Sequence, residues 1–167
     1  MYRSITYGWL TLDEVFEKIK EYIMSEPDSE YHVMIGCDSQ QHGDSLKLVS
    51  AIIVHRIGKG CIFFTEITTV KKRGISLREK IYDEASRSLE VAVQFKDKII
   101  SGENFPVDVV IHLDIGKTGK TSMLIKELVR YIENCGFEAC IKDTSRLMDK
   151  GYEYPVAASS VADRYSK

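Results

Sequence analysis

Two aspartates occupy equivalent positions at the ends of two hydrophobic segments of this chain. Asp38 follows the segment from Val33 to Cys37, and Asp114 follows the segment from Val109 to Leu113. Each segment predicts a short buried strand that ends in a carboxylate and a turn. If the strands are neighbours in one sheet, both carboxylates emerge at one edge, where a divalent cation relieves their repulsion. The pattern therefore predicts metal-assisted chemistry on phosphate groups.

Further acids come from predicted helices. Glu79 stands three residues after Ser76, so a helix-capping box already accounts for it. Glu84 lies beside the inward apolar stripe of the same helix and is the preferred third acid. Asp163, near the end of the sequence, is a candidate fourth ligand, although an exposed helical position explains it equally well. Strand-terminal aspartates such as Asp38 also often only begin a turn.

The candidate ligands are all carboxylates. Oxygen-only ligation by Asp38, Glu84, Asp114 and Asp163 suits Mg²⁺ or Mn²⁺ rather than zinc. Two such ions about 4 Å apart activate a water molecule and stabilise the leaving oxygen in phosphodiester hydrolysis. The sequence thus favours a metal-dependent hydrolase of phosphodiesters.

Basic residues close to Asp114 are candidates for substrate binding. Lys117 and Lys120 lie in the predicted loop after Asp114, where they can neutralise substrate phosphates. His112 alternates onto the same strand face as Asp114 and is a candidate for proton transfer. Histidines at such positions are more often packed and hydrogen-bonded, so both interpretations of His112 stay open.

The segment 116–121 resembles a nucleotide-binding P-loop. Its sequence is Gly-Lys-Thr-Gly-Lys-Thr, but the motif requires a glycine at position 114, which is Asp114. A carboxylate there repels phosphate, so a P-loop is not predicted.

The hydrophobic periodicity predicts one N-terminal helix followed by the order β-β-β-α-β-α-β-α. The predicted elements are a helix from Leu12 to Met24, a strand ending at Asp38, strands from Leu46 to Ile57 and from Cys61 to Val70, a helix from Ser76 to about Lys98, a strand ending at Asp114, a helix from about Lys120 to Asn134 that Gly136 stops, a strand from Phe137 to Lys142, and a terminal helical turn capped by Ser159 or Ser160.

This order predicts a mixed five-stranded sheet of the α/β class, with three antiparallel strands and then parallel βα units. The first crossover places the strand of Asp114 parallel to and beside the strand of Asp38. Ligand sites in such sheets lie outside the carboxyl ends of the strands, where both aspartates are predicted.

Composition restricts the class of protein. The 167 residues are 44% hydrophobic and 29% charged, with a net charge of −2. These values predict a single domain, residues 1–167, with residues 1–28 as an N-terminal helical extension. We expect a cytoplasmic protein without disulfides or membrane spans, because no signal-peptide core is recognisable and the four cysteines lack zinc or CxxC spacing. A basic group, residues 71–80, contains Lys71, Lys72, Arg73, Arg78 and Lys80.

Several phrases of the sequence resemble the ribonuclease H-like YkuK family, whose members are small bacterial proteins of poorly defined function. They are Ile35–Gln40, His55–Gly60, Ser76–Ile81 and Leu113–Gly116, and the most specific is Ala158–Lys167. The resemblance covers nearly the whole chain and implies a ribonuclease H-like fold with an acidic metal site.

The resemblance implies that Asp38 and Asp114 are the first-strand and fourth-strand aspartates of that site. Glu84, or else Glu79, corresponds to the helix glutamate, and Asp163 to the late acid. A metal-dependent nuclease acting on RNA, DNA or a hybrid is the leading interpretation. The alternative is a non-catalytic nucleic-acid or protein-binding module that retains the fold, and a phosphatase or nucleotide hydrolase is a third interpretation. The sequence does not define the oligomeric state.

Overall fold

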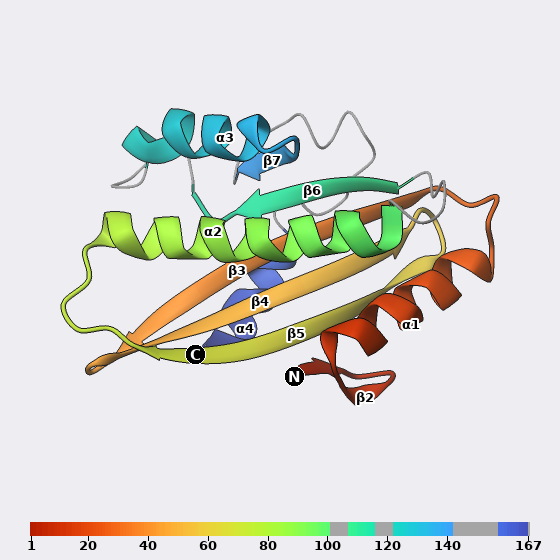
Figure 1. Ribbon diagram of the computed structural model, residues 1–167, viewed down its shortest axis with the longest axis horizontal. Helices are drawn as coiled ribbons and strands as arrows, with labels where there is room; N and C mark the ends of the chain where they lie inside the picture. The colour runs from red at the N-terminus through yellow and green to blue at the C-terminus, as the bar shows by residue number, and fades with distance from the viewer. Residues whose placement is uncertain (101–106, 116–121, 142–156, 167) are drawn as a thin grey trace.

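The computed structural model describes residues 1–100, 107–115, 122–141 and 157–166 of the chain. Its strands form one mixed sheet in the order β2-β1-β5-β4-β3-β6-β7 (Figure 1). The strands are β1 (Tyr2–Ser4), β2 (Gly8–Leu10), β3 (Tyr31–His42), β4 (Ser45–Arg56), β5 (Gly60–Lys71), β6 (Val107–Leu113) and β7 (Glu138–Ile141). The α/β class and the mixed sheet agree with the sequence-based prediction.

The centre of the sheet is the predicted antiparallel meander of β3, β4 and β5. β3 pairs with β4 from Tyr31 to His42, so the strand continues four residues beyond Asp38, where a turn was predicted. The hairpin closes only at Gly43, whose φ of 57° is the left-handed conformation that a tight turn requires. Asp38 therefore lies within a strand and not at its end.

The crossover after β5 runs through α2 (Leu77–Phe95) and one π-helical turn, η1 (Lys96–Ile100). Ser76 caps α2: its side chain accepts from the backbone of Glu79, and the Glu79 carboxylate accepts from the Ser76 backbone. β6 then returns parallel to β3, as predicted. This connection places the chain around Asp114 beside the chain around Asp38.

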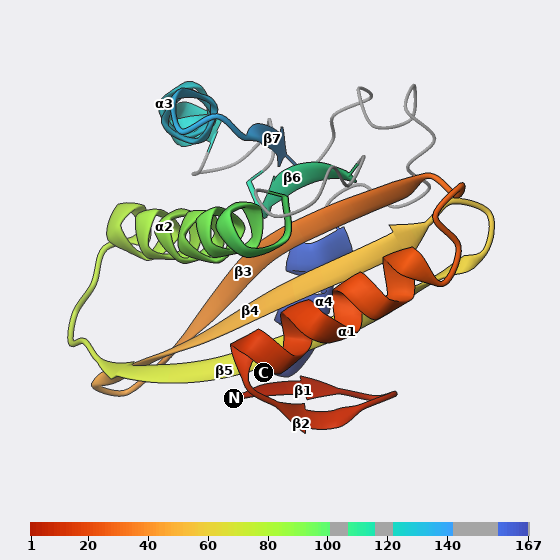
Figure 2. The ribbon, with the colours of Figure 1, turned by 45° about the vertical axis from the view of Figure 1, so that its right-hand side comes forward.

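The sheet separates two helical layers (Figure 2). α1 (Leu12–Met24), α2 and α3 (Ile125–Asn134) pack on one face, where they form the larger core with β-strand residues such as Ile35, Ile52 and Ile111. Of the described helices, only α4 (Ala157–Ser166) packs on the opposite face, against a smaller cluster that includes Met34, Val49 and Ala51. No helix in the described part of the chain is long and apolar enough to span a membrane.

The structure differs from the prediction at the N-terminus. Residues 1–28 are not wholly helical, because β1 and β2 form a short hairpin that extends the sheet beyond β5 and brings the number of strands to seven. Three-residue strands are too short to show an alternating pattern, which is why sequence periodicity missed them.

Two helix boundaries also differ. A short 3₁₀-helix, η2 (Ser122–Leu124), precedes α3, while the predicted start at Lys120 lies outside the described residues. The terminal helix begins at Ala157, so Ser159 and Ser160 lie inside it and do not cap it. Its second residue, Ala158, donates its backbone N–H to Nδ1 of His112 at 3.3 Å, so tertiary contact supplies part of the capping.

Candidate functional site

Asp38 and Asp114 lie level with each other on neighbouring strands. The β3–β6 ladder pairs Gly36 with His112 and ends there, two residues before each aspartate. Adjacent strands are about 4.8 Å apart. The backbones of β3 and β6 are therefore neighbours up to Gly36 and His112, two residues before the aspartates. Asp38 is half-buried and Asp114 is exposed. The structure thus brings together the two acids that the sequence predicted to share a site.

Asp38 belongs to the sheet face that carries α4. It stands opposite Val49 of β4, which packs in the α4-side cluster. The neighbouring residues Cys37 and Ser39 therefore point to the α2 side, because side chains alternate along a strand. Around Asp38, both faces of β3 contribute polar groups to the region.

Glu84 approaches this region from α2. Its side chain is buried, and its Oε1 accepts a hydrogen bond of 2.7 Å from Oγ of Ser39, the residue next to Asp38. Nζ of Lys80, one turn earlier on α2, lies 3.6 Å from the same oxygen. Glu79, by contrast, is exposed and occupied in the capping box with Ser76. Of the two helix acids, Glu84 is the one that faces the aspartates.

Burial raises the pKa of Glu84 to about 7. The hydrogen bond from Ser39 and the charge of Lys80 oppose this shift, whereas the negative charges of Asp38 and Asp114 add to it. The same surroundings raise the pKa of the Cys37 thiol, first through burial and then through the charge of Glu84. The negative charges of Asp38 and Asp114 therefore act on the buried carboxyl group of Glu84, and a bound cation would offset this repulsion.

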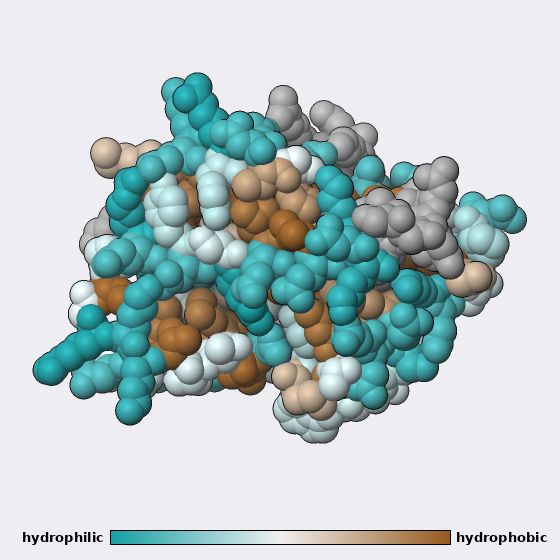
Figure 3. Space-filling view, viewed as in Figure 1, coloured by the Kyte–Doolittle hydropathy of each residue, from teal (hydrophilic) through white to brown (hydrophobic). Residues whose placement is uncertain are grey.

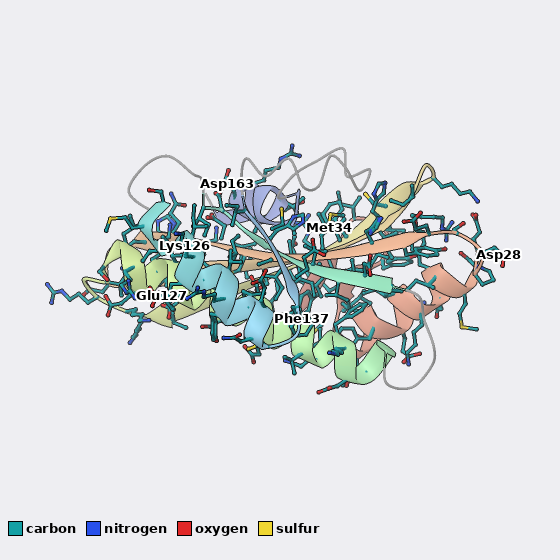
Figure 4. The ribbon with its side chains drawn as sticks, turned by 90° about the horizontal axis from the view of Figure 1, so that it is seen from above. Asp28, Met34, Lys126, Glu127, Phe137 and Asp163 are labelled. Atoms are coloured by element: carbon teal, nitrogen blue, oxygen red, sulfur yellow. The ribbon has the colours of Figure 1, made fainter. Side chains whose placement is uncertain are left out.

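Asp163 is half-buried on α4, next to the fully buried Ala162. Figure 4 shows it on the side of the sheet away from α2, which is the face of Asp38. The residues fit Mg²⁺ or Mn²⁺ in chemical type, since all four are carboxylates. Within the described ranges, however, no three His, Cys, Asp or Glu side chains are gathered closely enough to surround an ion.

His112 is fully buried and accepts the hydrogen bond from the backbone of Ala158. This contact ties the start of α4 to β6, two residues before Asp114. The position supports the packed interpretation of His112 over proton transfer. Lys117 and Lys120 lie outside the described residues.

Two residues of this region were not predicted from the sequence, namely Ser39 and Lys80. Ser39 looked like a turn residue after a strand, and Lys80 looked like one member of a basic group. The i, i+4 spacing of Lys80 and Glu84 was the available indication of their ion pair.

Most of the basic group in residues 71–80 is paired with acids. Lys72 pairs with Asp83, Arg73 with Asp44, Arg78 with Glu127 and Lys80 with Glu84. These acids offset much of the positive charge of the basic group.

A groove of about 410 Å³ lies between α2 and the strands β4 and β5, on the face away from Asp38. Leu48 and Val70 line it together with Lys72, Asp83 and Arg87. Figure 3 shows apolar residues exposed in this region, between α2 and β5. None of the candidate metal ligands lines this groove.

Comparison with known proteins gives a consistent family assignment. A family model described as ribonuclease H-like matches residues 14–167. The uncharacterized protein YkuK of Bacillus subtilis (strain 168) is 33% identical over 177 residues, which cover 100% of this chain and 97% of the relative.

Two solved structures show low similarity to this chain. Ribonuclease H1 from the halophilic archaeon Halobacterium salinarum NRC-1 has a TM-score of 0.39 and 16% identity, covering 80% of this chain and 98% of its own. The N-terminal ribonuclease H domain of Rv2228c from Mycobacterium tuberculosis has a TM-score of 0.36 and 11% identity, covering 82% and 96%. At these values the two structures add nothing to the assignment, which rests on the family model and on YkuK.

Proposed function

The chain belongs to the ribonuclease H-like family, and on that premise we propose that it is a divalent-metal-dependent nuclease that hydrolyses phosphodiester bonds of RNA, DNA or a hybrid. The observation that carries the proposal is the buried Glu84, whose pKa the neighbouring Asp38 and Asp114 help to raise. A nearby cation would lower the raised pKa of this carboxyl group, so the binding of a cation would favour its ionised form.

Asp38, Glu84, Asp114 and Asp163 are the residues that would hold Mg²⁺ or Mn²⁺. When bound, such ions supply an activated water molecule and neutralise charge on the phosphoryl oxygens. Ser39 fixes the Glu84 carboxylate through its 2.7 Å hydrogen bond, and Lys80 offsets part of its charge. Lys117 and Lys120 remain candidates for contacts with substrate phosphates.

The first test is metal binding. Calorimetric titration with Mn²⁺ and Mg²⁺ should give binding in the wild type and none in the double variant Asp38→Asn/Asp114→Asn. Asp28→Asn is the matched control, because Asp28 is exposed in the α1–β3 connection, far from this site (Figure 4). The control should bind metal like the wild type.

The second test is cleavage of end-labelled single-stranded RNA, single-stranded DNA and an RNA–DNA hybrid. Asp38→Asn and Asp114→Asn should each abolish metal-dependent cleavage while the fold persists, and Asp28→Asn should cleave normally. Full cleavage by both variants would refute the proposal. If oligonucleotides bind but are not cleaved in the presence of either Mg²⁺ or Mn²⁺, the result would instead favour the alternative interpretation, a non-catalytic binding module.

A further inference from the structure

Among the residues that the structure describes, α4 covers only part of the sheet face next to the candidate site. Residues that stand opposite each other on antiparallel strands point to the same face of the sheet. Asp38 of β3 stands opposite Val49 of β4, and Val49 stands opposite Ile67 of β5, so all three side chains lie on one face. α4 covers this face over Val49 and Ala51. Further toward the β3–β4 hairpin, the rows Gln40–Lys47–Thr69 and His42–Ser45–Lys71 continue the same face.

The same face extends sideways onto the N-terminal hairpin. Thr65 of β5 pairs with Arg3 of β1, and Arg3 pairs with Trp9 of β2. Because Thr65 and Ile67 are two residues apart, Arg3 and Trp9 lie on the same side of the sheet as Ile67. We call this surface the open sheet face, and it comprises Arg3, Trp9, Lys47, Ile67, Thr69 and Lys71.

The open sheet face has an unusual mixture of side chains. Trp9 and Ile67 are 66% and 52% exposed, although large apolar residues normally gain by burial. The charged members Arg3, Lys47 and Lys71 are all basic. On the reverse face at the same strand ends, Cys37, Leu46 and Leu48 are buried and pack with Val70 and Ile75, beside the groove already described.

Lys71 of this face differs from its neighbours in sequence. Lys72, Arg78 and Lys80 form ion pairs with acids of α2 and α3. Lys71 points to the other side of β5 from Lys72, is exposed, and makes no ion pair with any residue that the structure describes. Lys71 therefore adds positive charge to the face of Asp38, whereas the charges of Lys72, Arg78 and Lys80 are offset by acids on the helical side.

We propose that the open sheet face binds a single-stranded nucleic acid and leads it to the acids around Asp38. This inference rests on the proposed function and deepens it by naming the form of the substrate. Exposed aromatic and apolar side chains accept stacked bases, and basic side chains between them contact the phosphates. Four strand spacings separate β3 from β2, about 19 Å, which is about six nucleotides of a stacked strand.

The test measures binding alone, so that it is independent of cleavage. A fluorescein-labelled 12-nucleotide single strand is titrated with the Asp38→Asn variant in EDTA, and anisotropy is recorded at several salt concentrations. Lys47→Gln/Lys71→Gln in that background should weaken binding and reduce the slope of log Kd against log salt by about 1.4, because each lysine that neutralises a phosphate accounts for about 0.7. Lys18→Gln/Lys20→Gln, two lysines of α1, should leave the slope unchanged.

Trp9 gives an independent readout because it is the only tryptophan of the chain. Its fluorescence should be quenched by an unlabelled single strand, and a duplex of the same sequence should quench it much less. Trp9→Ala should weaken anisotropy-detected binding by about 5- to 150-fold, the range expected for one stacked base, without changing the salt slope. Circular dichroism of each variant confirms that it is folded.

Unchanged affinity and slope in Lys47→Gln/Lys71→Gln, together with an unaltered Trp9 spectrum at saturation, would overturn the inference. Loss of self-association in Trp9→Ala, with no oligonucleotide binding, would also overturn it and assign the face to a protein partner. If single strands bind as expected but no metal-dependent cleavage occurs, the nuclease proposal fails while this inference stands. If cleavage occurs and these variants cleave and bind normally, only this inference fails.

Discussion

Glu84 is the residue whose surroundings most constrain the chemistry. Its carboxyl group is buried between a serine that donates to it and two aspartates that repel it. Ser39 holds the orientation of Glu84 but does not neutralise its charge. The hydrogen bond therefore positions a group whose ionisation depends on what else enters the site.

Glu84 should make the metal-free protein less stable as the pH rises. Its pKa is about 7 in the folded chain and near 4.5 in the unfolded chain, so the folded state binds more protons between those values. Stability is therefore full below about pH 4.5 and falls by about 3 kcal/mol by pH 7. Glu84→Gln removes this dependence, and its stability relative to wild type should increase between pH 5 and pH 8 in urea unfolding with EDTA.

Glu79→Gln is the matched control on the same helix. Hydrogen bonds from Ser76 lower the pKa of Glu79, so its contribution has the opposite sign and is present above its unfolded pKa. An unchanged stability difference between wild type and Glu84→Gln at pH 5 and pH 8 would mean that Glu84 is ionised throughout.

At the scale of elements, α1 is fixed to the sheet by Arg56 of β4. The guanidinium donates through Nε to the Tyr31 hydroxyl at 2.8 Å and through Nη1 to Glu26 at 2.7 Å. It also donates to the Tyr22 carbonyl and the Ser25 hydroxyl, and it stacks 4.0 Å from the Tyr22 ring centroid. One side chain thus satisfies the C-terminal end of α1, which has no basic residue in its last turn.

Arg56→Met should destabilise the protein by about 2–3 kcal/mol, because it removes the hydrogen bonds of the guanidinium, including the buried one to the Tyr31 hydroxyl. Chemical denaturation measures the change. Metal binding by the folded variant should be normal, because Arg56 is the last residue of β4 and lies seven residues from Val49, the partner of Asp38. Lys59→Met is the control: it contacts the same Glu26 from an exposed position and should change stability by less than about 1 kcal/mol. Equal effects of the two substitutions would contradict the role of Arg56.

At the scale of the whole molecule, the sheet separates a large core from a small one. α1, α2 and α3 share the large core, whereas α4 rests on the smaller cluster around Met34, Val49 and Ala51. Stability is not uniform in such a structure, and an element that buries little apolar side-chain surface opens early. The buried residues among the described part of α4 are the small Ala158 and Ala162, whereas α1 buries Phe16 and Ile19. Because α4 carries Asp163, undocking of α4 would remove one of the proposed ligands from the candidate site.

Hydrogen exchange should therefore show faster exchange in α4 than in α1 and α2. Ala162→Leu, which overfills a fully buried contact of α4, should increase exchange in α4 while β4 and β5 remain protected. Ala92→Leu, an equally buried alanine of α2, is the matched control and should lower protection across the large core. Uniform loss of protection in both variants would show that the two layers unfold together.

The sequence by itself determined the α/β class and the meander followed by βα units, and it predicted Asp38, Asp114 and Glu84 as candidate acids. These features depend on local periodicity and on capping chemistry. For example, the Ser76–Glu79 capping box accounts for Glu79, which left Glu84 as the preferred helix acid. Only the tertiary structure decided that β3 continues past Asp38, that β1 and β2 extend the sheet, and that α4 begins against His112. Those features depend on pairing between distant segments, which no local pattern encodes. For the same reason, the division of the basic residues between a paired face and an open sheet face became visible only in the folded chain.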